Sequence, residues 1–195
     1  MSAAASSDMP GQISAGRGAG FVALTGVCAL LFASLFLGAC VAANGAPVVS
    51  GPTSLIDRRA PEFARKDLGG RILELRSFRG KVVLLNFWAT WCAPCLTEMP
   101  VFSSWQRQYG PQGMQVIGIS MDDDSPPVQE VVTKLKLEYP VAMGDAKLGE
   151  HYGGVLGLPL TYLVDRNGIV RAQFQGEIDL NIIETRLKMV LAQQR

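Results

Sequence analysis

The chain has 195 residues, a length that suits one ordinary domain with an appended segment. Hydrophobic residues make up 48% and charged residues 18% of the sequence, a balance that excludes a wholly disordered chain. The 18 lysines and arginines nearly equal the 17 aspartates and glutamates. The formal charge of +1 therefore excludes a strongly basic nucleic-acid-binding protein and an acidic tail.

The apolar excess of the chain, whose mean hydropathy is +0.20, lies near the N-terminus. No charged residue occurs from 18 to 56, and residues 21–37 are nearly continuous hydrocarbon. Such a run can just span a bilayer as a helix and is slightly long for a signal-peptide core. Arg17 precedes it and the next basic residue is Arg58, so the positive-inside rule places the rest of the chain outside the cytoplasm.

The end of this segment, Leu37-Gly38-Ala39-Cys40, resembles a bacterial lipoprotein cleavage box, in which the Cys40 thiol becomes lipidated. Two alternatives stay open, an uncleaved transmembrane helix and a cleaved secretory signal. Residues 1–40 are thus expected to form an export signal or membrane anchor. Residues 41–56, rich in Ala, Pro, Gly and Ser, read as a flexible linker, and residues 57–195 as the folded domain.

Strand and helix patterns alternate through this domain. Strands are expected at 71–75, 81–88, 114–120, 160–164 and 169–174, and helices at 92–109, from 126 to about 137, and from Asp179. Asn167-Gly168 predicts a two-residue hairpin turn. In the last helix an apolar face is expected from Ile182, Ile183, Leu187, Val190 and Leu191. This order predicts a single α/β domain with a central mixed sheet and helices on both sides.

The sequence Trp91-Cys92-Ala93-Pro94-Cys95 follows a buried strand and opens a helix. Two residues between the cysteines let both sulfurs meet in the first helical turn and form a reversible disulfide. The helix N-terminus stabilises a thiolate, so Cys92 is expected to be the exposed nucleophile and Cys95 the resolving thiol. The alternatives are half of a zinc site, for which the domain offers only His151 as a further nitrogen ligand, and a purely structural disulfide.

From about Ala60 to Leu191 the domain resembles the TlpA/ResA/CcmG-type family, the membrane-tethered thioredoxin-like thiol–disulfide oxidoreductases of bacteria. The resemblance is carried by Ala60-Pro61-Glu62-Phe63, by residues 78–95, by Glu98-Met99-Pro100, by residues 116–120 and by Gly157-Leu158-Pro159-Leu160-Thr161 with residues 162–168. It implies a thioredoxin fold with an N-terminal strand or hairpin extension and an inserted strand–helix unit.

The same resemblance assigns roles to single residues. Pro159 matches the family's cis-proline beside the disulfide, and Leu158 before it would touch the substrate. Leu160 stands where the family often has threonine, so the resemblance is weaker at this position of the substrate groove. Glu98 matches a buried acid that exchanges a proton with the resolving cysteine, with a solvated helix glutamate as the alternative.

Residues around the cysteine pair complete the predicted site. Trp91, Ala93 and Pro94 are expected to line the substrate-docking surface, with plain packing as the alternative for Trp91. Asn86 stands where ordinary thioredoxins carry a buried aspartate, which would leave proton handling to Glu98.

Three further features are expected to serve structure. Trp88 is expected in the core and His151 at the surface or partly buried. The run Asp122-Asp123-Asp124 is expected in a solvated loop, because it lacks the ligand spacing of a calcium site.

The predicted function is an extracytoplasmic thiol–disulfide oxidoreductase that reduces protein disulfides, with the Cys92–Cys95 disulfide as its redox group and no separate cofactor or metal. The resemblance implies apocytochrome c or copper-site assembly proteins as substrates and a CcdA/DsbD-type membrane electron donor, with no nucleic-acid partner. The expected location is the bacterial periplasm or outer cell face, anchored through Cys40 or an uncleaved helix.

A disulfide oxidant or isomerase and a Cu(I)-delivery module using Met99 remain alternatives. A peroxiredoxin-like peroxidase is disfavoured because no proline precedes Cys92 in residues 84–91.

Overall fold

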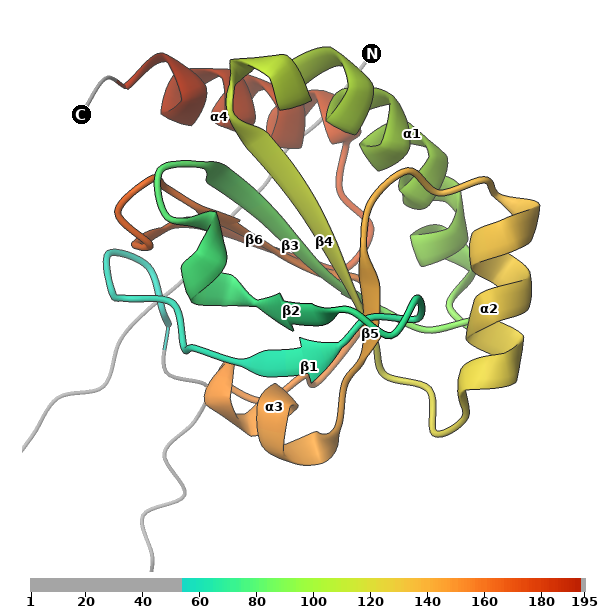
Figure 1. Ribbon diagram of the computed structural model, residues 1–195. Helices are drawn as coiled ribbons and strands as arrows, with labels where there is room; N and C mark the ends of the chain where they lie inside the picture. Colours follow the sequence, from blue (N-terminus) through green and yellow to red (C-terminus); the bar gives the residue numbers. More distant parts are fainter. Residues whose placement is uncertain (1–53, 194–195) are drawn as a thin grey trace, which may run out of the picture. The chain divides into compact units, whose positions relative to one another are not determined.

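The computed structural model describes residues 54–193 (Figure 1). The strands are β1 (Ala64–Lys66), β2 (Ile72–Glu74), β3 (Val82–Trp88), β4 (Met114–Ser120), β5 (Val141–Met143), β6 (Leu160–Val164) and β7 (Val170–Gln175). The α-helices are α1 (Ala93–Tyr109), α2 (Ser125–Lys134), α3 (Ala146–His151) and α4 (Leu180–Ala192). None of the helices in this part of the chain has the length and apolar character needed to cross a membrane.

Five strands form one sheet in the order β5-β4-β3-β6-β7. β3 lies at its centre, parallel to β4 and antiparallel to β6, and all seven residues of β3 are buried. A strand covered on both faces reads as a continuous apolar run, which is why its sequence predicts it well. The sheet is mixed, as expected.

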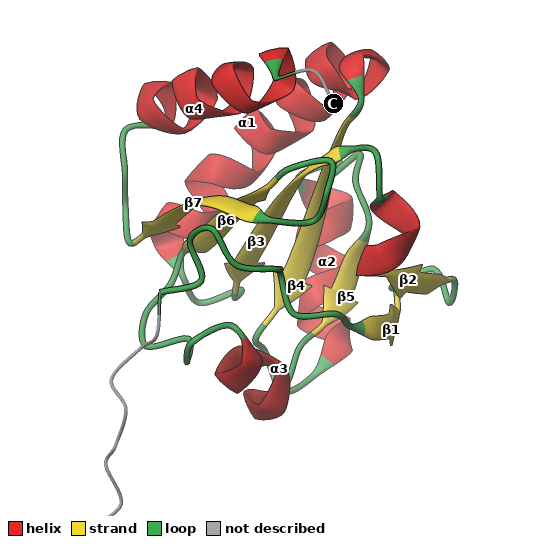
Figure 2. Cartoon of the chain, turned by 90° about the vertical axis from the view of Figure 1, so that its left-hand side faces the viewer, coloured by secondary structure: helices red, strands yellow, loops and turns green. Residues whose placement is uncertain are grey.

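Alternate residues of β3 face two separate cores. Val82, Leu84 and Trp88 pack with the apolar sides of α1, α2 and α4, and Figures 1 and 2 show α1 and α4 running together over this face. Val83, Leu85 and Phe87 pack instead with α3 and with the β1–β2 hairpin. Helices therefore cover both faces, as predicted, and each fully buried aliphatic side chain contributes about 1.5–3 kcal/mol.

The N-terminal extension is a two-stranded antiparallel hairpin of β1 and β2. The strand expected over 71–75 is shorter than predicted, because the chain turns into a 3₁₀-helix over Leu75–Phe78. Leu75 is buried in the second core, and the turn carries the chain from the hairpin to the start of β3. The inserted unit includes β5, which lies at the sheet edge beside β4.

The β6–β7 hairpin is present, but its turn differs from the predicted two-residue loop. The Gly168 N–H bonds to the Asp165 carbonyl at 2.9 Å, and the Asp165 N–H bonds to the Ile169 carbonyl at 2.8 Å. Gly168 has φ +77° while Asn167 does not have positive φ, so three residues form the loop. The Asp165 carboxylate accepts the Asn167 and Ile169 N–H groups at 2.9 Å, which stabilises this longer turn.

In α4 the Asp179 carboxylate accepts the Asn181 N–H at 2.9 Å, so the predicted N-cap is confirmed. Ile183, Leu187 and Val190 are buried, but Ile182 is 56% exposed and does not belong to the packed face. The i, i+4, i+7 spacing from Ile183 fixes the buried stripe and leaves its neighbour Ile182 turned outward.

Candidate active site

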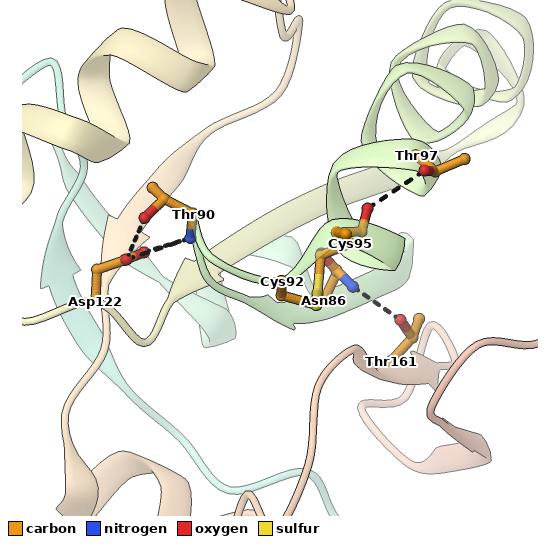
Figure 3. The surroundings of a disulfide bond; sticks show 8 residues. Asn86, Thr90, Cys92, Cys95, Thr97, Asp122 and Thr161 are labelled. Carbon is orange, nitrogen blue, oxygen red and sulfur yellow. Dashed lines mark hydrogen bonds between the residues drawn. A yellow bond between two sulfur atoms is a disulfide. The ribbon is translucent and has the colours of Figure 1, made fainter.

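Cys92 and Cys95 form a disulfide with a Cα–Cα distance of 5.3 Å. Cys92 is the N-cap of α1 and Cys95 lies in its first turn, so both sulfurs are at the helix N-terminus, as the spacing predicted (Figure 3). The expectation of an exposed Cys92 is wrong for this oxidised state. Cys92 is 5% exposed and Cys95 is fully buried, and both belong to the core that packs beneath α1.

The loop that carries Cys92 is fixed to the end of β4 by Asp122. The Asp122 carboxylate accepts the Thr90 N–H at 3.0 Å and the Thr90 hydroxyl at 2.6 Å (Figure 3). It also accepts the Ser120 hydroxyl at 2.7 Å. The run therefore lies in a loop with Asp123 and Asp124 exposed, as predicted, but Asp122 is half-buried and bonded to Thr90, 32 residues away in the sequence.

The Leu158–Pro159 peptide bond is cis, which confirms the geometry expected there. Pro159 is buried and Leu158 is half-buried. The Pro159 carbonyl accepts the Gly176 N–H at 2.8 Å, so the β7–α4 loop lies beside the cis-proline. This bond makes residues after β7 neighbours of the predicted substrate site.

The predicted docking residues are accessible to different degrees. The Trp91 side chain is 72% exposed, Ala93 is exposed and Pro94 is half-buried. Trp88, three residues before Trp91, is fully buried in the core, as expected. An exposed indole next to Cys92 provides apolar contact area for a partner, because aromatic rings carry much of the contact energy in interfaces.

Glu98 is only 4% exposed, and its Oε2 atom has no hydrogen-bond partner among the described residues. Burial, assisted by repulsion from Glu177, raises the pKa of Glu98 from 4.5 to about 7. The solvated alternative for Glu98 is therefore wrong. The Tyr139 hydroxyl is also buried, with no hydrogen-bond partner in residues 54–193, and burial together with the Glu98 charge raises the pKa of Tyr139.

Glu177 is a site residue that the sequence did not indicate. It is exposed in the β7–α4 loop, directly after Gly176, the residue bonded to Pro159. No local sequence pattern indicates Glu177, because it lies 79 positions after Glu98 in the chain. Its negative charge contributes to the raised pKa of Glu98 only because the fold brings the two together.

Asn86 is buried on β3 and donates its side-chain N–H to the Thr161 hydroxyl on β6 at 2.9 Å (Figure 3). An amide can make this bond without carrying a charge in the core, in contrast to a carboxylate. Because position 86 holds an uncharged amide, the buried carboxyl group near the cysteine pair is that of Glu98, on α1 three residues after Cys95.

Other predicted features lie apart from the disulfide or outside the described residues. His151 is exposed at the end of α3, as expected. Cys40, with the rest of the predicted signal and the linker up to residue 53, lies outside the described residues. Within residues 54–193, no group of three or more His, Cys, Asp or Glu side chains is placed to hold a metal ion.

Comparisons with known proteins agree with this geometry. Residues 56–173 match the AhpC/TSA family. The thiol-disulfide oxidoreductase ResA of Bacillus thuringiensis subsp. konkukian is 36% identical over 135 residues, which cover 69% of this chain and 78% of that protein. The ResA protein of Geobacillus thermodenitrificans is 33% identical over 131 residues, covering 67% and 75%.

Solved structures show the same fold. A thiol:disulfide interchange protein of the thioredoxin family from Chlorobium tepidum superposes with a TM-score of 0.64 at 28% identity, covering 69% of this chain and 96% of that one. The thioredoxin domain of a thiol-disulfide oxidoreductase from Bacteroides vulgatus gives a TM-score of 0.62 at 25% identity, covering 71% and 99%. With its cysteine pair at the start of α1, the chain belongs to the AhpC/TSA family and, within it, to the TlpA/ResA/CcmG-type thiol–disulfide oxidoreductases of thioredoxin fold.

Proposed function

We propose that this chain is an extracytoplasmic, membrane-tethered reductant of protein disulfides that works through Cys92 and Cys95. The observation that carries the proposal is the disulfide at the N-terminus of α1, with cis-Pro159 in the neighbouring loop and Glu98 buried one turn further along the helix. The tether and the location are supported by the uncharged apolar run of residues 21–37.

The reaction starts from the reduced pair. The Cys92 thiolate attacks one sulfur of the substrate disulfide, which forms a mixed disulfide and releases the other substrate sulfur as a thiolate. Cys95, once deprotonated, attacks the Cys92 sulfur and releases the second substrate thiol. Two electrons have then passed to the substrate, and the enzyme is left in the Cys92–Cys95 disulfide form.

Glu98 is the proposed proton acceptor for Cys95. A carboxyl group with a pKa near neutrality changes its protonation state readily at physiological pH. Because Cys95 is fully buried, water has little access to its thiol, and a nearby buried base is needed to remove the proton. Protonating Glu98 in this step also removes a charge from the core.

The direction of electron flow follows from location. A dithiol kept reduced in an oxidising compartment needs a dedicated source of electrons, and the family resemblance supplies a CcdA/DsbD-type membrane donor. Substrates of the proposed reductant are protein disulfides, with apocytochrome c or copper-site assembly proteins as the classes that the resemblance implies.

Two measurements test the proposal. Cys95→Ser should accumulate a mixed disulfide with a substrate protein through Cys92, and Cys92→Ser, the matched control, should not. Equal turnover of wild type and Cys95→Ser would contradict the two-cysteine mechanism. The reduction potential of the pair should be about −270 mV, and a value of about −120 mV would identify a disulfide donor instead.

A further inference from the structure

Basic side chains gather at the end of the sheet that lies opposite the disulfide. Backbone bonds from Gly80 N–H to the Arg166 carbonyl and from Ala60 N–H to the Gly168 carbonyl, each 2.9 Å, hold three segments together at this end. The segments are residues 57–60, the loop before β3 and the β6–β7 turn. The exposed cations of this basic end are Arg58, Arg59, Arg79, Lys81, Lys134 and Lys136.

Lys134, the last residue of α2, and Lys136, two residues later, extend the basic end along the β5 edge of the sheet. β5 runs parallel to β4 and its first residue, Val141, pairs with Gly118, so the residues between α2 and β5 run along the β5 edge of the sheet, on the side away from the disulfide end of β4. Lys136 has φ +51°, at the position after a helix where glycine is usual. A lysine kept in this left-handed conformation places an exposed cation at the edge of the group.

Three of the acids at this end are paired, whereas Glu130, one turn before Lys134 on α2, forms no salt bridge among the described residues. Glu62 binds Arg79, Glu138 binds Arg107 at 2.5 Å, and Asp57 binds Arg171 at 2.8 Å. In the described part of the chain, Arg58, Arg59, Lys81, Lys134 and Lys136 form no salt bridge. The basic end therefore carries an excess of positive charge, although the whole chain has a net charge of only +1.

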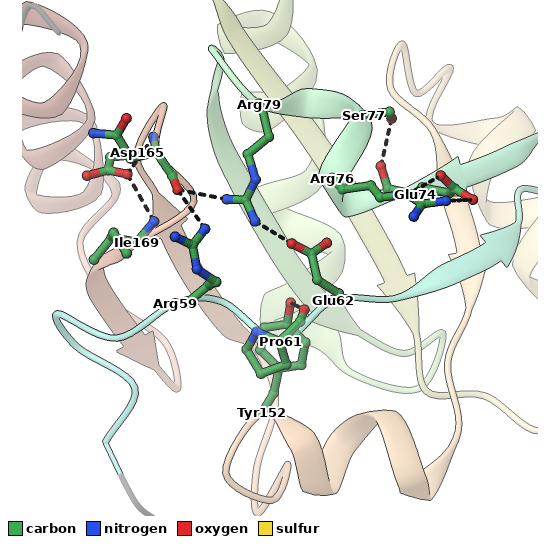
Figure 4. Close-up of polar contacts among 11 residues, drawn as sticks. Arg59, Pro61, Glu62, Glu74, Arg76, Ser77, Arg79, Tyr152, Asp165 and Ile169 are labelled. Atoms are coloured by element: carbon green, nitrogen blue, oxygen red, sulfur yellow. Dashed lines mark hydrogen bonds and ion pairs between the residues drawn. The ribbon is translucent and has the colours of Figure 1, made fainter.

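Two guanidinium groups converge at the β6–β7 turn. Arg59 and Arg79 both donate to the Asn167 carbonyl, at 3.1 and 2.9 Å (Figure 4). Glu62 already pairs with Arg79, so Arg59 is the guanidinium at this turn without a carboxylate partner among the described residues, and an anionic phosphate oxygen can supply one. The turn thus presents a local arrangement suited to phosphate groups.

The disulfide end has the opposite character. Asp123, Asp124, Glu177 and Asp179 are exposed in the loops around the carboxyl ends of β4 and β7, the end of the sheet at which Cys92 follows β3. The seven residues of β3 separate the two ends by about 20 Å.

The chain enters the folded domain at the basic end. Asp57 N–H bonds to the Val170 carbonyl at 2.8 Å, and Val170 N–H bonds to the Arg58 carbonyl at 2.9 Å. The membrane tether of the proposed function would therefore join the folded domain at this end, opposite the disulfide. This step rests on the membrane tether of the proposed function.

We propose that the basic end docks on anionic phospholipid headgroups and holds the disulfide end away from the membrane. Basic side chains close to an anionic leaflet are attracted to it over a Debye length, and the acidic loops at the other end are repelled. The orientation exposes Trp91 and the cysteine pair to soluble protein substrates.

The test uses the full chain reconstituted into vesicles of phosphatidylcholine alone or mixed with phosphatidylglycerol. Lysines are acetylated with an amine-reactive reagent, and the labelling rate of each is followed by mass spectrometry. Lys81 and Lys136 should react about fivefold more slowly on the anionic vesicles, the factor that one basic side chain contributes near such a surface. Lys147, which lies on α3 at the disulfide end, is the internal control and should react equally on both.

Variants sharpen the result. Lys134→Gln together with Lys136→Gln should restore much of the labelling of Lys81 on anionic vesicles, whereas Lys147→Gln should leave it unchanged. High salt should remove the protection. Equal labelling of Lys81 on both vesicles, or equal protection of Lys147, would overturn the proposal.

Vesicle flotation distinguishes failure of the docking from failure of the membrane tether on which it rests. A chain that floats with neutral vesicles but shows no lysine protection on anionic ones retains its tether and refutes the docking. A chain that floats with neither vesicle refutes the tether, and the docking falls with it, while disulfide exchange in detergent tests the redox function independently.

Discussion

Glu98→Gln is expected to remove a pH dependence from the folding stability of the oxidised protein. The carboxyl group of Glu98 has a pKa of about 7 in the folded chain, against 4.5 as its ordinary value. At pH values between 4.5 and about 7, Glu98 is mostly protonated in the folded protein and mostly ionised in the unfolded chain. The free energy of unfolding therefore falls as the pH rises through this window.

The size of the effect follows from the pKa difference. At about 1.4 kcal/mol per pH unit, the stabilising contribution of the protonated Glu98 amounts to about 3 kcal/mol. This contribution is fully present below about pH 4.5, declines as the pH rises, and is lost above about pH 7. Glutamine has nearly the same shape and stays neutral, so the variant keeps the packing of the protonated acid at every pH.

The assay is urea unfolding of the oxidised wild type and of Glu98→Gln from pH 4 to pH 8. Using the oxidised form keeps both cysteines from titrating. The variant should be similar to wild type at the acidic limit and more stable by up to about 3 kcal/mol at the alkaline limit. Glu130→Gln, which removes an exposed carboxylate from α2, is the matched control. A difference between Glu98→Gln and wild type that stays constant with pH would refute the reasoning.

Three further substitutions test other contacts. Gly168→Ala should lower the free energy of unfolding by about 2 kcal/mol in urea titrations, because φ is +77° and a Cβ would lie 0.9 Å from the Arg79 guanidinium; an unchanged midpoint would contradict the described turn. Asp122→Ala should cost about 1–3 kcal/mol in the same assay, since it leaves the buried Ser120 hydroxyl and the half-buried donors of Thr90 without their acceptor. Glu177→Gln should lower the pKa of Glu98, seen as a shift of its stability profile to lower pH, and an unmoved profile would show that repulsion from Glu177 is unimportant.

The sequence predicted the central elements well because their signals are local. β3 is one unbroken apolar run with a single amide, and the cysteine pair marks the start of α1 without reference to any other segment. The cis geometry of Pro159 came from the family resemblance, since the bond itself leaves no trace in composition.

The parts that were missed depend on distant residues. The role of Asp122 requires Thr90 to be brought to the end of β4, and β5 is a three-residue edge strand whose pairing with Gly118–Ser120 gives no periodic signal. Glu177 acts on Glu98 through space across the β7–α4 loop. Local patterns cannot reveal such pairings, because the fold alone decides which segments meet.

The backbone bonds at the start of the domain also decide where mechanical load would be carried. A pull on the chain before Asp57 reaches the domain through its bonds with Val170 and through the Ala60–Gly168 bond, all of them at the β6–β7 hairpin. The cysteine loop contributes none of these bonds. Tension in a tether would therefore strain the hairpin first and leave the geometry of the reacting sulfurs undisturbed.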